Sequence, residues 1–187
     1  ACDEAALGRK LDDWFVGESL AVARVLDGAA VLASDFRIDP AGHVRMAVFV
    51  HPDQGARRVG RIVQRLCEIE MYRALSMLGL ARARLVSGEM GALDRRLADL
   101  VTGMAQAGSQ AESVLDDLMA VSAELEQLEM SASFRFSATR AYAAIVLDRI
   151  AVLRETRFGG RQTLDEFMRR RWDPAMRTVR AAEARLA

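Results

Sequence analysis

A long run of apolar residues at alternating steps of four and three dominates the middle of the chain. The run consists of Leu93, Leu97, Leu100, Met104, Ala107, Ala111, Val114, Leu118, Val121, Leu125 and Leu128. We call it the heptad seam. This spacing predicts an α-helix that packs its apolar side against partner helices. We therefore expect residues 93–128 to form one long helix within a bundle.

The middle of the heptad seam is weaker than its two ends. Small residues gather there, namely Gly103, Ala107, Gly108, Ser109 and Ala111. Each glycine inside a helix costs about 1 kcal/mol relative to alanine. We therefore expect a kink near Gly108 or the close approach of a neighbouring helix. Val101 and Leu115 widen the apolar stripe, which favours an antiparallel bundle within the chain over a simple dimeric coiled coil.

Charge is unevenly distributed although the net charge of the chain is zero. Residues 88–130 hold 2 basic and 9 acidic side chains, a net charge of −7. The flanking residues 56–87 carry 7 basic and 2 acidic side chains, and residues 131–187 carry 12 and 6. An acidic segment between two basic ones suits a bundle formed within one chain. The basic segments lack interleaved aromatic residues, so we expect no nucleic acid partner.

The first 55 residues have a different spacing. A short helix is expected at 5–15, and three runs with alternating apolar residues follow between residues 20 and 50. Asp27-Gly28 separates the first two runs and is a strong hairpin signal, and Asp39-Pro40-Ala41-Gly42 reads as a turn. This pattern predicts a three-stranded antiparallel meander. Three strands are near the minimum for a stable sheet, so we expect helices to cover it or strands outside this chain to complete it.

From residue 57 onward the apolar spacing changes to about 3.6 residues, which is typical of helices. We predict helices at about 57–85, 89–130, 134–157 and 164–187. The first break is expected at Ser87-Gly88 and the second after Met130, at Ser131-Ala132-Ser133.

The start of the last predicted helix carries its own signals. Thr163 and Glu166 are spaced as a capping box, and Pro174 should kink or interrupt the helix at Asp173. The sequence thus predicts an α+β, mostly α fold, with a small three-stranded antiparallel meander packed on an elongated antiparallel four-helix assembly. The expected domains are residues 1–55 and residues 56–187.

Polar and aromatic residues on two predicted helices form a possible polar network: Glu68, Glu70, Tyr72, Arg73, Arg135, Arg140 and Tyr142. Glu70 and Arg73 are three residues apart and can pair on a helix. Glu68 and Glu70 are two residues apart and point about 200° away from each other, so they do not form a catalytic dyad unaided. We therefore favour structural pairing with arginine, and a hydrolase that uses Glu68 or Glu70 is the less favoured interpretation.

Cysteine and histidine show no metal-ligand spacing. Cys2 and Cys67 lie far apart, and His43 and His51 fall in predicted loops. We predict no metal ion, no cofactor and no catalytic residue, and we expect Cys67 in the core. No run of about 18 apolar residues and no signal peptide is visible.

Five stretches taken together resemble one family. They are Asp35-Phe36-Arg37-Ile38, residues 60–73, residues 136–142, residues 162–167 and residues 174–178. With these motifs the chain resembles the bacterial membrane-anchored proteins known as domain of unknown function 3422, from about Leu11 to its end. The resemblance implies an N-terminal part and a C-terminal hydrophobic anchor that lie outside this chain. It implies no established activity, substrate or cofactor.

These observations predict a non-enzymatic interaction or scaffold domain. Its expected partner is a protein or a second copy, bound through the helices. The full-length protein is expected at the membrane through the missing C-terminal segment, with its soluble face in the cytoplasm. The first residue is not methionine and the last helix has no stop signal, so we expect a soluble piece of a longer protein. The alternative is the soluble domain of an oligomeric ion channel or transporter.

Overall fold

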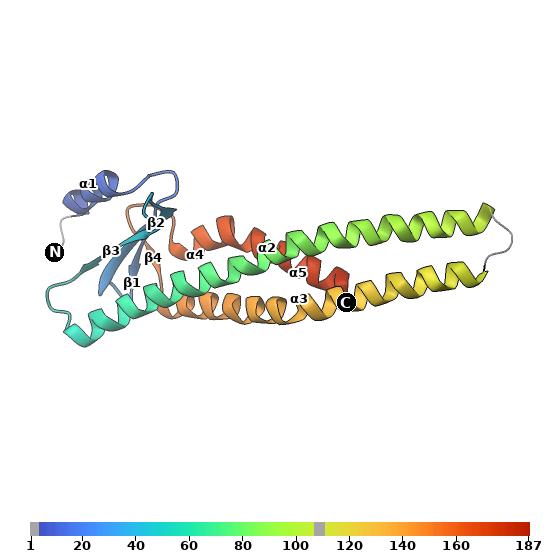
Figure 1. Cartoon of the computed structure of the whole chain (residues 1–187). Helices are drawn as coiled ribbons and strands as arrows, with labels where there is room; N and C mark the ends of the chain where they lie inside the picture. The colour runs from blue at the N-terminus through green and yellow to red at the C-terminus, as the bar shows by residue number, and fades with distance from the viewer. Residues whose placement is uncertain (1–3, 107–110) are drawn as a thin grey trace. The chain divides into compact units, whose positions relative to one another are not determined.

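The computed structural model describes residues 4–106 and 111–187, which are mostly helical and include a small antiparallel sheet (Figure 1). The predicted fold class, α+β and mostly α, is confirmed. The elements in chain order are α1 (Glu4–Trp14), β1 (Ala21–Val25), β2 (Ala30–Ile38), β3 (Val44–Val50), α2 (Ala56–Gln106), α3 (Ala111–Leu153), β4 (Thr156–Arg157), α4 (Leu164–Phe167), the π-helical segment η1 (Met168–Trp172) and α5 (Asp173–Leu186).

Internal contacts group the chain into two compact units. Unit 1 combines residues 1–73 with residues 143–174, and unit 2 combines residues 74–142 with residues 175–187. The two long helices α2 and α3 each contribute to both units. Each unit is described by itself below. The predicted division at residue 55 stays a prediction.

The sheet belongs to unit 1 and has the strand order β3-β2-β1-β4, with antiparallel pairing throughout. The predicted meander of β1, β2 and β3 is confirmed, but the count of three strands is wrong. A fourth strand, β4, pairs Arg157 with Ala23. Its two residues are too few for an alternating pattern, so periodicity could not reveal it.

Both predicted turns of the meander are present. In the first, Asp27 and Gly28 have φ values of 59° and 84°, in the left-handed region that a tight reversal requires. In the second, the Gly42 amide donates to the Asp39 carbonyl at 2.9 Å. Local turn chemistry was therefore sufficient to locate both reversals.

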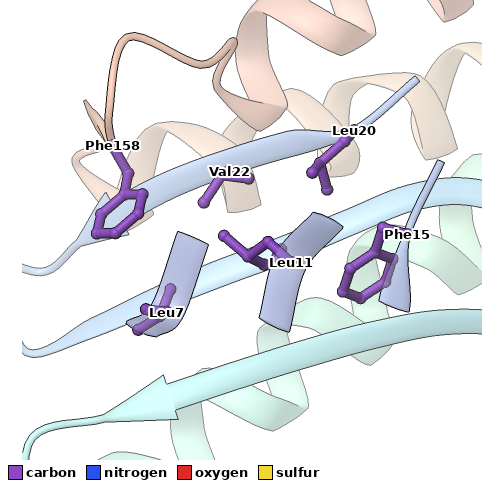
Figure 2. Packing of buried hydrophobic residues seen from close by; sticks show 7 residues of the cluster. Leu7, Leu11, Phe15, Leu20, Val22 and Phe158 are labelled. Carbon is purple, nitrogen blue, oxygen red and sulfur yellow. The ribbon is translucent and has the colours of Figure 1, made fainter. Parts of the chain in front are cut away.

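The core of unit 1 lies between α1 and the sheet (Figure 2). Leu7 and Leu11 are four residues apart on α1 and are buried together with Phe15, which follows the helix. They pack in one cluster with Leu20, Val22, Ala33 and Phe158. The helix covers the sheet as expected for a sheet this small.

The predicted break at Ser87-Gly88 is wrong, because α2 continues through it to Gln106. The Ser87 hydroxyl donates to the carbonyl of Ala83 at 2.8 Å, which satisfies this polar group inside the helix. Val86 and Met90 are buried on either side. Burying an apolar side chain contributes about 1.5–3 kcal/mol, which outweighs the cost of one glycine.

The predicted single helix over residues 93–128 is also wrong. α2 ends at Gln106 and α3 begins at Ala111, and the two helices then run antiparallel. Arg96 pairs with Glu124, and Arg82 donates to the Ser131 hydroxyl. The heptad seam is therefore split between two helices that face each other. The expected kink near Gly108 lies outside the described residues.

Two further helix boundaries and the position of Cys67 differ from the sequence prediction. The predicted break at Ser131-Ala132-Ser133 lies inside α3, where Ala132 is fully buried. The predicted end near residue 157 is wrong, because α3 ends at Leu153. Cys67 is exposed rather than in the core, because on α2 it lies about 100° around the helix from the buried Leu66.

The capping box at the start of the last helical region is confirmed. The Thr163 hydroxyl accepts the Glu166 amide at 3.2 Å, and the Glu166 carboxylate accepts the Thr163 amide at 3.0 Å. The expected interruption before Pro174 is also present, since the π-helical segment η1 separates α4 from α5. The Asp173 amide donates five residues back to the carbonyl of Met168, which is the π-helical pattern.

Candidate functional site

The seven residues of the predicted polar network fall into different units. Glu68, Glu70, Tyr72 and Arg73 belong to unit 1, whereas Arg135, Arg140 and Tyr142 belong to unit 2. The expected pair of Glu70 and Arg73 is present as a two-pronged ion pair, with distances of 2.6 and 2.7 Å. In unit 2, Arg140 pairs with Glu183 of α5 at 2.9 Å. A functional network among all seven stays a prediction.

Glu68 is engaged by two neighbours that sequence reasoning did not single out. Its carboxylate accepts the Gln64 side-chain amide at 2.8 Å and also the guanidinium of Arg149 on α3. The hydrogen bond from Gln64 and then that from Arg149 lower the pKa of Glu68 below its ordinary value. A general acid at neutral pH needs a raised pKa instead, so this geometry disfavours a hydrolase that uses Glu68 as its acid.

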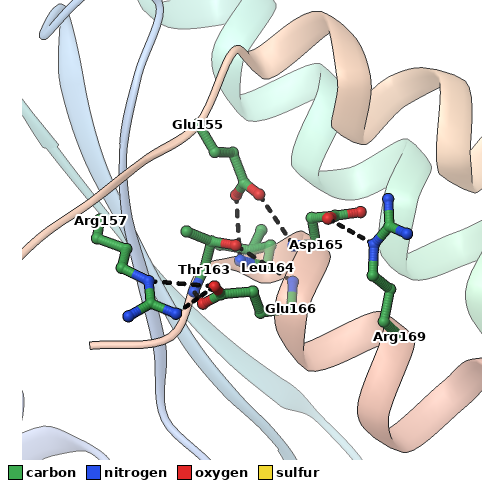
Figure 3. Close-up of polar contacts among 7 residues, drawn as sticks. All are labelled: Glu155, Arg157, Thr163, Leu164, Asp165, Glu166 and Arg169. Carbon is green, nitrogen blue, oxygen red and sulfur yellow. Dashed lines mark hydrogen bonds and ion pairs between the residues drawn. The ribbon is translucent and has the colours of Figure 1, made fainter. Parts of the chain in front are cut away.

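A half-buried carboxylate, that of Glu155, lies at the start of α4 (Figure 3). Its oxygens accept the amides of Leu164 at 3.2 Å and Asp165 at 2.9 Å. Burial raises the pKa of Glu155, and these two hydrogen bonds oppose the rise. Nearby, Arg157 and Arg169 pair with Glu166 and Asp165. The carboxylate thus holds a helix terminus, which is a structural role.

A more deeply buried carboxylate, that of Asp35, lies in unit 1 where β2 is irregular opposite β3. Asp35 accepts the backbone amides of Val16 and Arg37, both at 3.1 Å. The next residue, Phe36, has a φ of 52° and stacks on Phe167 with the ring centroids 4.5 Å apart. The hydrogen bonds of Asp35 and the stacking of Phe36 thus give the Asp35-Phe36 motif a structural role, which is to fix the backbone at this irregular part of β2.

The strongest candidate site is a surface of unit 2. We call residues 74–106 of α2 and residues 111–142 of α3 the hairpin. Several large apolar side chains of its distal part are exposed, with fractions of 41% for Leu97, 58% for Val101, 57% for Leu115, 63% for Met119 and 38% for Leu125. We call these five residues the open face. Single exposed apolar residues are ordinary, but a contiguous group marks a binding surface.

Two of these residues, Leu97 and Leu125, lie on the side of the hairpin where α5 is seated, and helical spacing places Val101 and Met119 on the same side. Arg185 of α5 pairs with Asp94, and it lines a groove together with Leu97 and Leu125. Val101 is seven residues beyond Asp94, and seven residues are two turns in packed helices. Met119 lies three steps of seven residues before Arg140 and so points to the same side of α3. Arg140 in turn pairs with Glu183 of α5. The open face therefore continues the groove in which α5 is seated, beyond the end of that helix.

The opposite side of the hairpin is polar. A groove there is lined largely by charged and amide side chains, among them Arg82, Glu89, Arg96, Glu124 and Gln127. Arg96 donates to both carboxylate oxygens of Glu124, at 2.8 and 2.7 Å. The hairpin thus has one face lined mainly by polar side chains, some of which pair with each other, and another that leaves apolar groups in water. The open face includes Leu97 and Leu125 of the heptad seam together with Val101 and Leu115, which widen the apolar stripe. The sequence pattern marked these residues as apolar but did not show which of them stay uncovered.

Comparison with known families assigns the chain as a whole. The family described as "Protein of unknown function (DUF3422)" matches residues 2–187. The chain belongs to this family. The predicted resemblance is confirmed to that extent. No curated protein and no solved structure is significantly similar to the chain.

Two further observations concern the described residues of this DUF3422 chain. Within residues 4–106 and 111–187, no three His, Cys, Asp or Glu side chains are grouped so that they could hold a metal ion. In the same ranges, no helix has both the length and the apolar content needed to cross a membrane.

Proposed function

We propose that the chain is a non-enzymatic interaction domain and that the open face of its hairpin is the docking surface. The observation that carries this proposal is the exposure of Leu97, Val101, Leu115, Met119 and Leu125 on two adjacent helices. Burial of each such side chain by a partner would contribute about 1.5–3 kcal/mol. Helices in grooves are a recurrent mode of protein recognition.

The state of the carboxylates agrees with this proposal. In unit 1, the buried Asp35 and the half-buried Glu155 each accept two backbone amides. Such groups hold the backbone in place rather than react. We also propose that the domain is tethered to a bacterial membrane in the full-length protein, and the support for tethering is the family resemblance of the sequence.

Site-specific photo-crosslinking in the native host tests the docking surface. A photoreactive amino acid at Met119, or at Val101, should give a discrete covalent adduct with another protein. The matched control is Gln127, which lies on the polar side of the hairpin, and it should give none. Equal adducts at Met119 and Gln127, or no adduct at either position of the open face, would refute the proposal.

A further inference from the structure

The occupant of the open face can be specified from the charges around it. Glu112, Met119 and Glu126 are spaced by sevens on α3 and so share one side of that helix. Asp116 lies one turn beyond Glu112, and all three carboxylates are exposed. Among the residues that the structure describes, none of the three forms an ion pair. The α3 margin of the open face is therefore acidic.

The α2 margin differs from the α3 margin. Ala98 and Thr102 each follow a residue of the open face on α2, and the Thr102 hydroxyl donates to the Ala98 carbonyl at 2.8 Å. Both residues are small and uncharged, and the exposed Arg95 lies seven residues before Thr102, at the α5 end of this margin. A ligand on the open face would thus meet apolar side chains between a margin with few charges on α2 and a row of carboxylates on α3.

The chain itself shows which kind of helix fits this groove. In unit 2, α5 buries Met176, Val179, Ala182 and Leu186, and these residues follow one another at steps of three and four. At its margins α5 places Arg185 against Asp94 and Glu183 against Arg140. An arginine-bearing amphipathic helix therefore occupies the first part of the groove, and the open face is the part beyond it.

Resting on the proposed function, we propose that the open face binds an amphipathic helix of a partner protein, with lysine or arginine on the side that meets α3. Its apolar side would cover Leu97, Val101 and Met119. Its basic side would pair with Glu112, Asp116 and Glu126. A second copy fits less well, because two open faces would bring their carboxylates together and because the Arg-bearing helix α5 already buries its own apolar side.

The probe for this proposal is a stapled helical peptide with the sequence of residues 173–187, added to the 187-residue chain. A second peptide carries Glu in place of Arg177, Arg180 and Arg185 and keeps the apolar side unchanged. Two or three exposed ion pairs should make the arginine peptide bind about ten-fold tighter than the glutamate peptide at low salt. The difference should shrink as salt is added.

Two substitutions locate the binding. Met119→Arg should weaken binding of the arginine peptide by about ten-fold or more, because it removes apolar contact and adds a like charge. The matched control is Leu85→Arg. Leu85 is also exposed, at 60%, but it lies seven residues from Ala92, which lines the polar groove. Binding to the control variant should be unchanged.

Several results would overturn the inference. Equal binding of the two peptides, or tighter binding of the glutamate peptide, would exclude a basic partner helix. A chain that sediments as a dimer and becomes monomeric on Met119→Arg would assign the open face to a second copy. If neither peptide binds while crosslinks still form at Met119, the inference fails and the docking surface stands. If crosslinks are absent, the proposed function itself fails.

Discussion

Two stretches of the same hairpin, one beside α5 and one beyond it, differ in the exposure of the apolar side chains on the side where α5 lies. Beside α5, Ala83, Val86, Ala132 and Phe136 are at most 1% exposed. Beyond it, Val101 and Met119 are 58% and 63% exposed although they belong to the same two helices. A pair of helices can bury only the side chains between them. A third helix is needed to cover the groove that they form. The groove between the two helices of the hairpin is therefore covered only where α5 lies.

The two stretches also differ in how closely the helices approach at their glycines. Beside α5 the helices approach so closely that a Cβ at Gly79 would lie 2.2 Å from the Thr139 hydroxyl oxygen. A Cβ at Gly103, in the stretch beyond α5, would meet nothing within 4 Å. The close approach of the two helices at Gly79 is therefore not repeated at Gly103.

The largest expected effect breaks the covered stretch. Phe136→Ala should lower the free energy of unfolding by about 3–5 kcal/mol, because it removes a fully buried ring and leaves a cavity. The matched substitution Leu115→Ala, on the open face, should change it by less than about 0.5 kcal/mol. Urea unfolding followed by circular dichroism measures both. Equal losses would mean that the open face is buried in solution.

A smaller effect tests the close approach of the helices. Gly79→Ala should destabilise the chain by about 1–3 kcal/mol, since a Cβ forces Thr139 and its helix to move. The control Gly88→Ala has open space around it and should stabilise the chain by up to about 1 kcal/mol. Combining Gly79→Ala with Thr139→Ala should restore part of the loss. If Gly79→Ala stabilises the chain as the control does, the helices do not touch there.

The smallest expected effect is a change in the pH dependence of stability, which compares the half-buried carboxylate of Glu155 with the ion-paired carboxylate of Glu68. Burial raises the pKa of Glu155 above its ordinary 4.5, so the folded chain holds this proton more tightly than the unfolded chain does. Its contribution to stability is therefore full below about pH 4.5 and declines as the pH rises through the raised value. Glu155→Gln cannot ionise, so its stability relative to the wild type should improve between pH 4 and pH 7.

Glu68→Gln is the control for the sign of this effect. The pKa of Glu68 is lowered, first by Gln64 and then by Arg149, so its contribution is present above about pH 4.5 and is lost as the pH falls through the lowered value. Relative to the wild type, the Gln variant should therefore be least stable near neutral pH. Thermal melts across this pH range measure both variants. Parallel profiles for the two variants would contradict the assignment.

Much of the fold followed from local signals in the sequence. Alternation located β1, β2 and β3, Asp27-Gly28 located a hairpin turn, and Thr163 with Glu166 located a helix start. Each of these signals involves only a few neighbouring residues, so it can be recognised in the sequence alone. The spacing of Glu70 and Arg73 likewise predicted an ion pair that is present.

Other features depend on residues that are distant in the sequence. Glu68 pairs with Arg149, 81 residues away, and no local spacing could select that partner. The reversal between α2 and α3 was missed for a different reason. Two antiparallel helices turn their apolar sides toward each other, so the steps of four and three can continue in phase from one helix to the next. The small residues near Gly103 were therefore interpreted as a weak point within one helix.

The sequence by itself determined the apolar stripe along α2 and α3, because helical periodicity follows from backbone geometry alone. Only the tertiary structure decided where these helices end and which groove α5 fills. It thereby decided which apolar side chains remain in water. Coverage depends on the position of a third helix, and burial is a property of the assembled neighbours rather than of any one segment.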